Sequence, residues 1–178
     1  MRPASDRWVE PGVLVRSAYL HDGPARHLVH RLKYDGVAAV AHVLAGSMAP
    51  LVSGASALVP VPRTVVRRHR FGIDPGAELA AALAALTGIR VVAALRPEIV
   101  ARARAGRSRD ERREPGFRVR AAAPPGAVLI DDVITTGSTL RHVAGLTGVV
   151  RAVTATSRIL DSSWTGKRPK DQVTSLLE

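Results

Sequence analysis

The 178-residue sequence contains no cysteine and very few aromatic residues. Without cysteine the chain forms neither a disulfide nor a thiolate zinc site, and this composition is typical of a cytoplasmic protein. Phe, Trp and Tyr number two each, which argues against a single-strand nucleic-acid surface built on aromatic stacking. The apolar runs are too short for a membrane span, and residues 1–7 lack the apolar core of a signal peptide. We therefore expect a cytoplasmic protein without membrane contact.

Positive charge is in excess, since 26 Lys and Arg residues face 15 Asp and Glu residues and give a formal net charge of +11. Three interpretations remain open: a nucleic-acid surface, a site for polyanionic small molecules, or an Arg-rich composition. Hydrophobic residues make up 46% of the chain. A chain of this length and composition is sufficient for one globular domain with a real core.

Strand and helix patterns alternate along the chain, which predicts an α/β class. We expect a single-domain, three-layer fold with a mostly parallel central sheet over residues 1–160, followed by a C-terminal tail at 161–178. Strands are predicted at 13–20, 56–61, 91–95, 128–130 and 149–156, and helices at 25–34, 37–48, 75–87 and 138–146. The side chains expected to face the core from the last two helices are Leu79, Leu83, Leu86, Leu140, Val143 and Leu146.

One stretch carries most of the chemical information. An apolar run at 127–130 is followed by two adjacent carboxylates, Asp131 and Asp132, where we expect the strand to end. Small residues from Thr135 to Thr139 come next, at the predicted N-terminus of a helix, where backbone amides and the helix dipole favour a phosphate. The pattern predicts a ribose-phosphate clamp. Its alternative, a carboxylate pair that only starts a turn, is weaker in this context.

Two basic segments are candidate anion sites. Arg63 and Arg67 follow the predicted strand end at 59–62, a position at which α/β proteins bind ligands, although a solvated helix face would have the same composition. Residues 96–117 hold many arginines and few large apolar residues. They predict a flexible basic loop, which either closes over a pyrophosphate or is a solvated linker.

The residues at 128–140 (an apolar run, two acids, two apolar residues and Thr-Thr-Gly-x-Thr) resemble the motif with which type I phosphoribosyltransferases bind PRPP, 5-phosphoribosyl 1-pyrophosphate. A wider resemblance, over about residues 19–160, is to the ComF-like (competence protein F-type) branch of that family. The segments that carry it are Tyr19 with Gly23 and Pro24, Leu32 to Gly36, Val59 to Pro62, Arg70 to Gly72, and Arg104 to Arg113 with Phe117.

The sequence departs from the ComF-like pattern in four ways. The usual N-terminal zinc ribbon of cysteines is absent. The family's Arg-Gly-Phe-Asn-Gln run is replaced by residues 70–74, Arg-Phe-Gly-Ile-Asp. A later Gln is replaced by Arg104, and the Asn expected shortly after Arg112 is missing. The motifs for the PRPP donor are therefore intact, whereas those that would choose or activate the acceptor are altered.

The resemblance implies a type I phosphoribosyltransferase-like fold and an enzyme of nucleotide metabolism, a glycosyltransferase with Mg²⁺ as cofactor. It would transfer ribose 5-phosphate from PRPP to a nitrogenous base and release pyrophosphate. Asp131 and Asp132 would be catalytic, holding the ribose hydroxyls and Mg²⁺ directly or through water. The implied PRPP contacts are Asp131, Asp132, Val133, Thr135, Thr136, Gly137, Ser138 and Thr139, and the implied pyrophosphate contacts are Arg63, Arg67 and Arg112.

Other functions remain open. Purine-salvage relatives carry an acid where this chain has Thr135, and no residue presents itself as a general base. The ComF-like resemblance and the basic composition also fit a non-catalytic PRPP-sensing or DNA-uptake accessory protein that contacts nucleic acid through its Arg-rich face. A scaffold without PRPP affinity is disfavoured by the intact motif at 131–139. The identity of the acceptor and the formation of a homodimer stay open.

Overall fold

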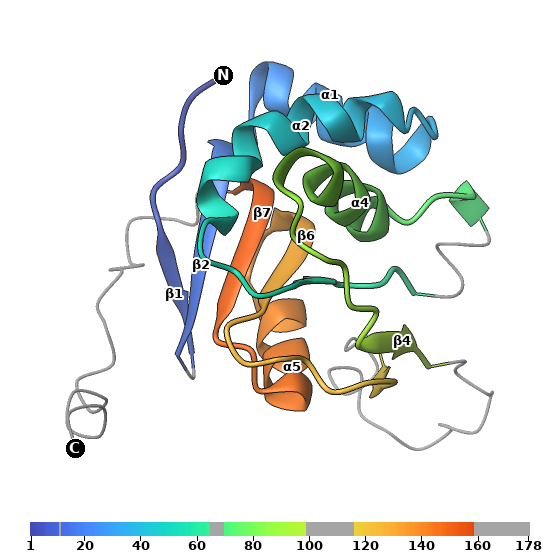
Figure 1. Cartoon of the computed structure of the whole chain (residues 1–178). Helices are drawn as coiled ribbons and strands as arrows, with labels where there is room; N and C mark the ends of the chain where they lie inside the picture. The colour runs from blue at the N-terminus through green and yellow to red at the C-terminus, as the bar shows by residue number, and fades with distance from the viewer. Residues whose placement is uncertain (11, 65–69, 99–115, 159–178) are drawn as a thin grey trace, which may run out of the picture.

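A five-stranded, mostly parallel sheet forms the centre of the computed structural model, which describes residues 1–10, 12–64, 70–98 and 116–158 (Figure 1). The strand order is β1-β2-β7-β6-β3. Strand β1 runs antiparallel to β2, and the remaining neighbours in this sheet pair in parallel. The strands are β1 (Arg7–Val9), β2 (Val13–Leu20), β3 (Leu58–Pro60), β6 (Val128–Ile134) and β7 (Arg151–Ser157).

Helices cover both faces of the sheet (Figure 1). On one face lie α1 (Gly23–Tyr34), α2 (Ala39–Met48), the short 3₁₀ helix η1 (Ala49–Val52) and α4 (Pro75–Thr87), and on the other lies α5 (Ser138–Thr147). Buried Leu44 and Leu83 pack with Ile130 of β6, whereas Leu140 packs with Leu129 of the same strand. Successive residues of a strand point to opposite faces. The predicted α/β class with a mostly parallel sheet is therefore confirmed.

The limits of α4 follow from local chemistry. The Asp74 side chain caps the helix by accepting a hydrogen bond from the Ala77 amide at 3.5 Å, and Pro75 fills the first helical position, where a missing N–H costs nothing. Gly88 ends the helix with a left-handed φ of 74°, which glycine adopts without strain. The predicted helix at 75–87 is confirmed at both ends.

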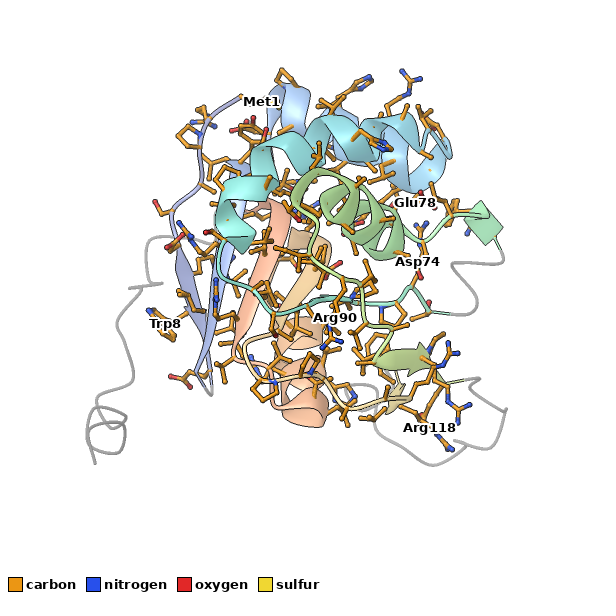
Figure 2. All side chains as sticks on the ribbon, viewed as in Figure 1. Met1, Trp8, Asp74, Glu78, Arg90 and Arg118 are labelled. Carbon is orange, nitrogen blue, oxygen red and sulfur yellow. The ribbon has the colours of Figure 1, made fainter. Side chains whose placement is uncertain are left out.

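Strand β1 is absent from the prediction. It has three residues, too few for a recognisable alternation. Val9 is 2% exposed and packs inward, whereas the Trp8 side chain extends away from the sheet (Figure 2). This strand matters for the site, because it lies against the loop before α5.

The predicted strand at 91–95 is wrong in position. Val91 makes a single parallel bridge to Leu58, and the chain then forms a separate antiparallel ribbon of β4 (Leu95–Pro97) and β5 (Phe117–Val119). The ends of the predicted flexible segment 96–117 are therefore paired, and Phe117 is 5% exposed. The pairing of β4 with β5 cannot be predicted from the sequence of either segment alone. Residues 99–115 lie outside the described part of the chain.

Two residues expected in the core are exposed. Leu86 is 55% exposed and Leu146 is 37% exposed, although Leu79, Leu83, Leu140 and Val143 are buried as predicted. Both exposed leucines lie in the last turn of their helices, where the apolar face is no longer covered. Within the described residues, no helix is long and apolar enough to cross a membrane.

Candidate functional site

A cavity of about 550 Å³ opens at the edge where the parallel strands end. Ligands of α/β sheets bind outside the carboxyl ends of the strands, and this cavity has that position. Its wall includes Lys33 and Tyr34 from the end of α1, Arg63 after β3, and Asp131 and Asp132 of β6. Val133, Thr135 and Thr139 also line it.

Strand β6 does not end at the two carboxylates, as predicted from sequence, but continues to Ile134. On one side its pairing with β3 stops at Pro60, opposite Ile130. On the other side its pairing with β7 continues to Ile134, opposite Ser157. The carboxylates therefore sit on a rigid strand whose β3 side has been left open, which fixes their positions at the cavity.

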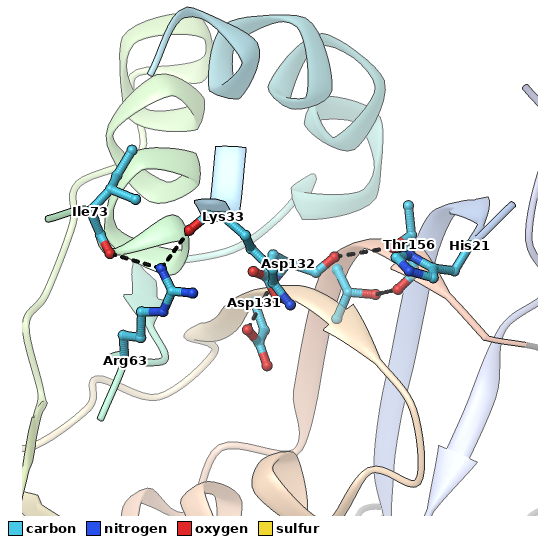
Figure 3. A network of polar contacts seen from close by, with 8 residues as sticks. His21, Lys33, Arg63, Ile73, Asp131, Asp132 and Thr156 are labelled. Atoms are coloured by element: carbon cyan, nitrogen blue, oxygen red, sulfur yellow. Dashed lines mark hydrogen bonds and ion pairs between the residues drawn. The ribbon is translucent and has the colours of Figure 1, made fainter. Parts of the chain in front are cut away.

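The two carboxylates are held differently. Asp132 is 6% exposed, and its Oδ1 lies 3.0 Å from Nζ of Lys33 (Figure 3). Asp131 Oδ1 accepts a hydrogen bond of 2.8 Å from the Asp132 amide. One acid is thus paired with a cation, while the other is bound by a backbone donor.

Burial and the neighbouring carboxylate of Asp132 raise the pKa of Asp131 well above its usual range, against the opposing charge of Lys33. A cation at the pair would relieve this repulsion. Mg²⁺ is commonly held by one or two carboxylates together with substrate phosphates, so the pair fits a magnesium that arrives with its substrate. Among the described residues there is no group of three or more His, Cys, Asp or Glu for an all-protein metal site.

The loop after β6 leads directly into the N-terminus of α5. Thr135, Thr136 and Ser138 are exposed, and no side chain caps the helix at Gly137. Gly137 has a φ of +82°, and a Cβ there would lie 2.8 Å from Cγ2 of Val9. Only glycine fits this close approach without strain. The Ser138 amide donates to the Thr136 hydroxyl at 3.5 Å. The remaining amides of the first turn and the adjacent hydroxyls suit an anionic group.

A buried arginine that the sequence did not single out supports this loop. Arg7 of β1 is 8% exposed, and its Nη1 donates to the backbone oxygens of Thr135 at 3.1 Å and Arg158 at 3.4 Å. Its burial lowers the pKa of the Arg7 guanidinium. Arg7 therefore joins the loop after β6 to the end of β7. A single Arg in a three-residue strand carries no sequence signal for this role.

Arg63, predicted to bind pyrophosphate, lines the cavity and also has a structural role. Its Nη1 donates to the carbonyl oxygens of Lys33 at 2.8 Å and Ile73 at 3.2 Å (Figure 3), and its guanidinium carbon lies 4.8 Å from the centre of the Phe71 ring. It ties the end of α1 to the segment before α4, whose capping residue Asp74 is marked in Figure 2. The other predicted pyrophosphate residues, Arg67 and Arg112, lie outside the described residues, as do residues 161–178.

A second polar network, also missed from sequence, joins the backbone of β6 at Asp132 to His21 at the end of β2. The Thr156 hydroxyl of β7 bonds Nδ1 of His21 at 2.8 Å and donates to the Asp132 carbonyl oxygen at 3.4 Å (Figure 3). Burial, followed by the charges of Arg158, Lys33 and Arg26, lowers the pKa of His21, and Asp132 partly opposes this. Histidine at a strand end is too common for sequence alone to reveal the network.

The fold and the site together define an α/β protein with a carboxylate pair, a helix N-terminus and several cations around one cavity. Comparison of the sequence with protein-family models and with curated proteins gives no match. Its function is therefore inferred from the chemistry of the site.

Proposed function

We propose that this protein is a Mg²⁺-dependent phosphoribosyltransferase that transfers ribose 5-phosphate from PRPP to a nitrogenous base and releases pyrophosphate. One observation carries the proposal: Asp131, Asp132, Thr135 and Thr139 line the same cavity at the carboxyl edge of a parallel sheet. A ribose phosphate carries both hydroxyl groups, which carboxylates can bind, and a phosphate, which a helix N-terminus can bind. The resemblance of residues 128–140 to a PRPP motif points to the same substrate.

The carboxylates act on the ribose. Asp131 and Asp132 accept hydrogen bonds from its 2′ and 3′ hydroxyls, and their negative charge stabilises the cation-like sugar formed as the leaving group departs. When bound with the substrate, Mg²⁺ supplies charge neutralisation for the pyrophosphate. Lys33, 3.0 Å from Asp132, orients that carboxylate.

The loop and Arg63 bind the two phosphate ends. Amides and hydroxyls from Thr135 to Thr139 hold the 5′-phosphate at the N-terminus of α5. Arg63, on the β3 side of the cavity, adds positive charge near the pyrophosphate. With the 5′-phosphate and the pyrophosphate both bound, the reacting carbon of the sugar is held in a fixed position beside β6.

Calorimetric titration with Mg²⁺-PRPP tests this proposal. We expect binding by the wild-type protein and its loss in the Asp131→Asn/Asp132→Asn double variant, whose fold should persist because the pair lies at the cavity. The matched control Asp6→Asn/Glu10→Gln also removes two acids, both at exposed positions, and should bind normally. Unchanged affinity in the Asp131/Asp132 variant would refute the assignment of the pair.

Catalysis is measured separately. A panel of purine and pyrimidine bases is incubated with Mg²⁺ and PRPP, and pyrophosphate release is followed. Release with at least one base is expected. PRPP binding without release for any base would instead favour the second candidate function, a PRPP-sensing or DNA-processing accessory protein, for which the net charge of +11 is the supporting observation.

A further inference from the structure

A second cavity, of about 460 Å³, adjoins the first at the β2 and β7 end of the sheet. The two cavities share three lining residues, His21, Arg26 and Arg158. These come from the end of β2, the first turns of α1 and the residue after β7. None of them is used by the proposed donor site.

The second cavity indicates where an acceptor would bind only if PRPP binds as proposed above, so the inference rests on that function. Pyrophosphate would lie on the β3 side, near Arg63, and the ribose at Asp131 and Asp132. A nucleophile that directly displaces a leaving group from a sugar carbon approaches from the opposite face of the ring. In the strand order β2-β7-β6-β3, the opposite side is that of β7 and β2, where His21 lies.

One tautomer of His21 allows both hydrogen bonds of the Thr156 hydroxyl to form together. Thr156 has one hydroxyl hydrogen, which it donates to the Asp132 carbonyl. The bond from Thr156 to Nδ1 of His21 therefore forms when Nδ1 carries the hydrogen, and Nε2 is left with a lone pair. No hydrogen bond of Nε2 to the described residues accompanies it. Nε2 is thus an acceptor in the wall shared by the two cavities.

Two arginines flank this acceptor without an ion pair. In the part of the chain that the structure describes, Arg26 and Arg158 have no acidic partner, whereas Arg2 in the same cavity wall is paired with Asp22. The Arg2–Asp22 pair is neutral overall, so Arg26 and Arg158 leave the shared wall with an excess of positive charge. Guanidinium groups of this kind bind carboxylates by paired hydrogen bonds.

We infer that this end of the cavity is the acceptor site, and that its acceptor is a nitrogen heterocycle bearing a carboxylate. Arg26 and Arg158 bind the carboxylate, and His21 Nε2 accepts the hydrogen bond of the reacting N–H. As the bond from nitrogen to the sugar carbon forms, the bond from that carbon to the pyrophosphate oxygen breaks. Pyrophosphate takes the bonding electrons, and the proton of the nitrogen passes to Nε2 and then to water.

The electrostatics of His21 agree with this role. Its lowered pKa, caused first by burial and then by Arg158, Lys33 and Arg26, keeps the ring neutral near pH 7, so that Nε2 retains its lone pair. The same cations would stabilise an anionic acceptor. A neutral base without a carboxylate gains nothing from them.

The test compares acceptors that differ in the carboxylate. Orotate is compared with uracil, and imidazole-4-carboxylate with imidazole-4-carboxamide, by kcat/KM for pyrophosphate release from Mg²⁺-PRPP. We expect the carboxylate member of at least one pair to be preferred about tenfold or more. The Arg26→Gln/Arg158→Gln variant should lose that preference. The control Arg31→Gln/Arg151→Gln removes two arginines from α1 and β7 outside both cavities and should keep it.

A second variant tests His21. His21→Asn keeps a donor for Thr156 and removes Nε2, so kcat should fall about a hundredfold with little change in the Kd of Mg²⁺-PRPP. If the two acceptors of each pair have the same kcat/KM, or if neither reacts, the inferred acceptor site is wrong. The proposed donor site is then still supported as long as PRPP binds. Unchanged kcat in His21→Asn overturns the role of Nε2. Absence of PRPP binding in the wild type overturns the proposed function and this inference with it.

Discussion

At Asp131 the stability of the fold and the proposed binding of a ligand make opposite demands on the side chain. Burial and the adjacent Asp132 raise its pKa, which means that its ionised form costs folding free energy. Its Oδ1 accepts a hydrogen bond from the next backbone amide, that of Asp132, a contact that an uncharged amide oxygen could also make. A residue that destabilises the fold at a cavity is typical of a functional site.

We predict that Asp131→Asn raises the free energy of unfolding at pH 7.5 while abolishing Mg²⁺-PRPP binding. The cost of the charge is complete above the folded pKa and disappears as the pH falls from that value to the unfolded value of about 3.9. The gain from the substitution should therefore shrink on acidification. Urea unfolding at several pH values measures it. A variant less stable than the wild type at pH 7.5 would contradict this electrostatic account.

His21 has the opposite pH dependence. Its pKa is lowered in the folded state, so the unfolded chain binds a proton more readily, and stability falls as the pH drops through about 6.5. We predict a loss of unfolding free energy between pH 7.5 and 5.5 that is smaller in His21→Asn. The matched control is His27→Asn, which removes an exposed histidine outside both cavities. Equal slopes in all three proteins would show that His21 does not titrate as described.

Among the elements, β1 contributes more to the site than its length suggests. Arg7 holds the carbonyl of Thr135, and the side chain of Val9 lies against Gly137. Both contacts are behind the loop that we propose to hold the 5′-phosphate. The strand therefore fixes the loop from the side away from the ligand, and the buried guanidinium adds positive charge beneath it.

Replacing Arg7 should weaken both the fold and the proposed phosphate site. We expect Arg7→Met to lose about 2–4 kcal/mol of unfolding free energy, because it leaves partly buried carbonyls without this donor, and to raise the Kd of Mg²⁺-PRPP. Arg7→Lys, which keeps the charge but not the forked geometry, should be intermediate in both. Thermal unfolding and calorimetry measure the two effects. Arg16→Met, at a partly exposed position, is the control, and a Kd unchanged in Arg7→Met would exclude a role in binding.

Long elements with capping residues were predicted from the sequence, whereas short strands were not. Helix α4 was predicted because Asp74, Pro75 and Gly88 are local signals that act on the backbone within one turn. Strand β1 and the β4–β5 ribbon were missed because three-residue strands depend on their pairing partners for stability. For the same reason β6 was predicted too short: its last residues are strand only because β7 pairs with them.

For the whole molecule, the net charge of +11 predicts electrostatic binding to nucleic acid. We expect weak, sequence-independent binding to duplex DNA, with the logarithm of the association constant falling linearly as the logarithm of salt concentration rises. Fluorescence anisotropy at several salt concentrations measures the slope. Addition of saturating Mg²⁺-PRPP would show whether the two ligands compete. DNA binding that does not weaken steeply with salt would exclude the electrostatic interpretation.

The sequence by itself determined the α/β class, the capped helix α4 and the candidate donor residues Asp131 to Thr139, because each depends on neighbours within a few positions. Only the tertiary structure brought Arg7, His21 and Lys33 to those residues, from β1, the end of β2 and α1, about a hundred or more positions earlier in the chain. Such contacts depend on strand order and register, and chains with the same local pattern can adopt different strand orders and registers. The ligand groups of the candidate site are thus local in sequence, whereas their supports, and the side from which an acceptor would approach, depend on the assembled sheet.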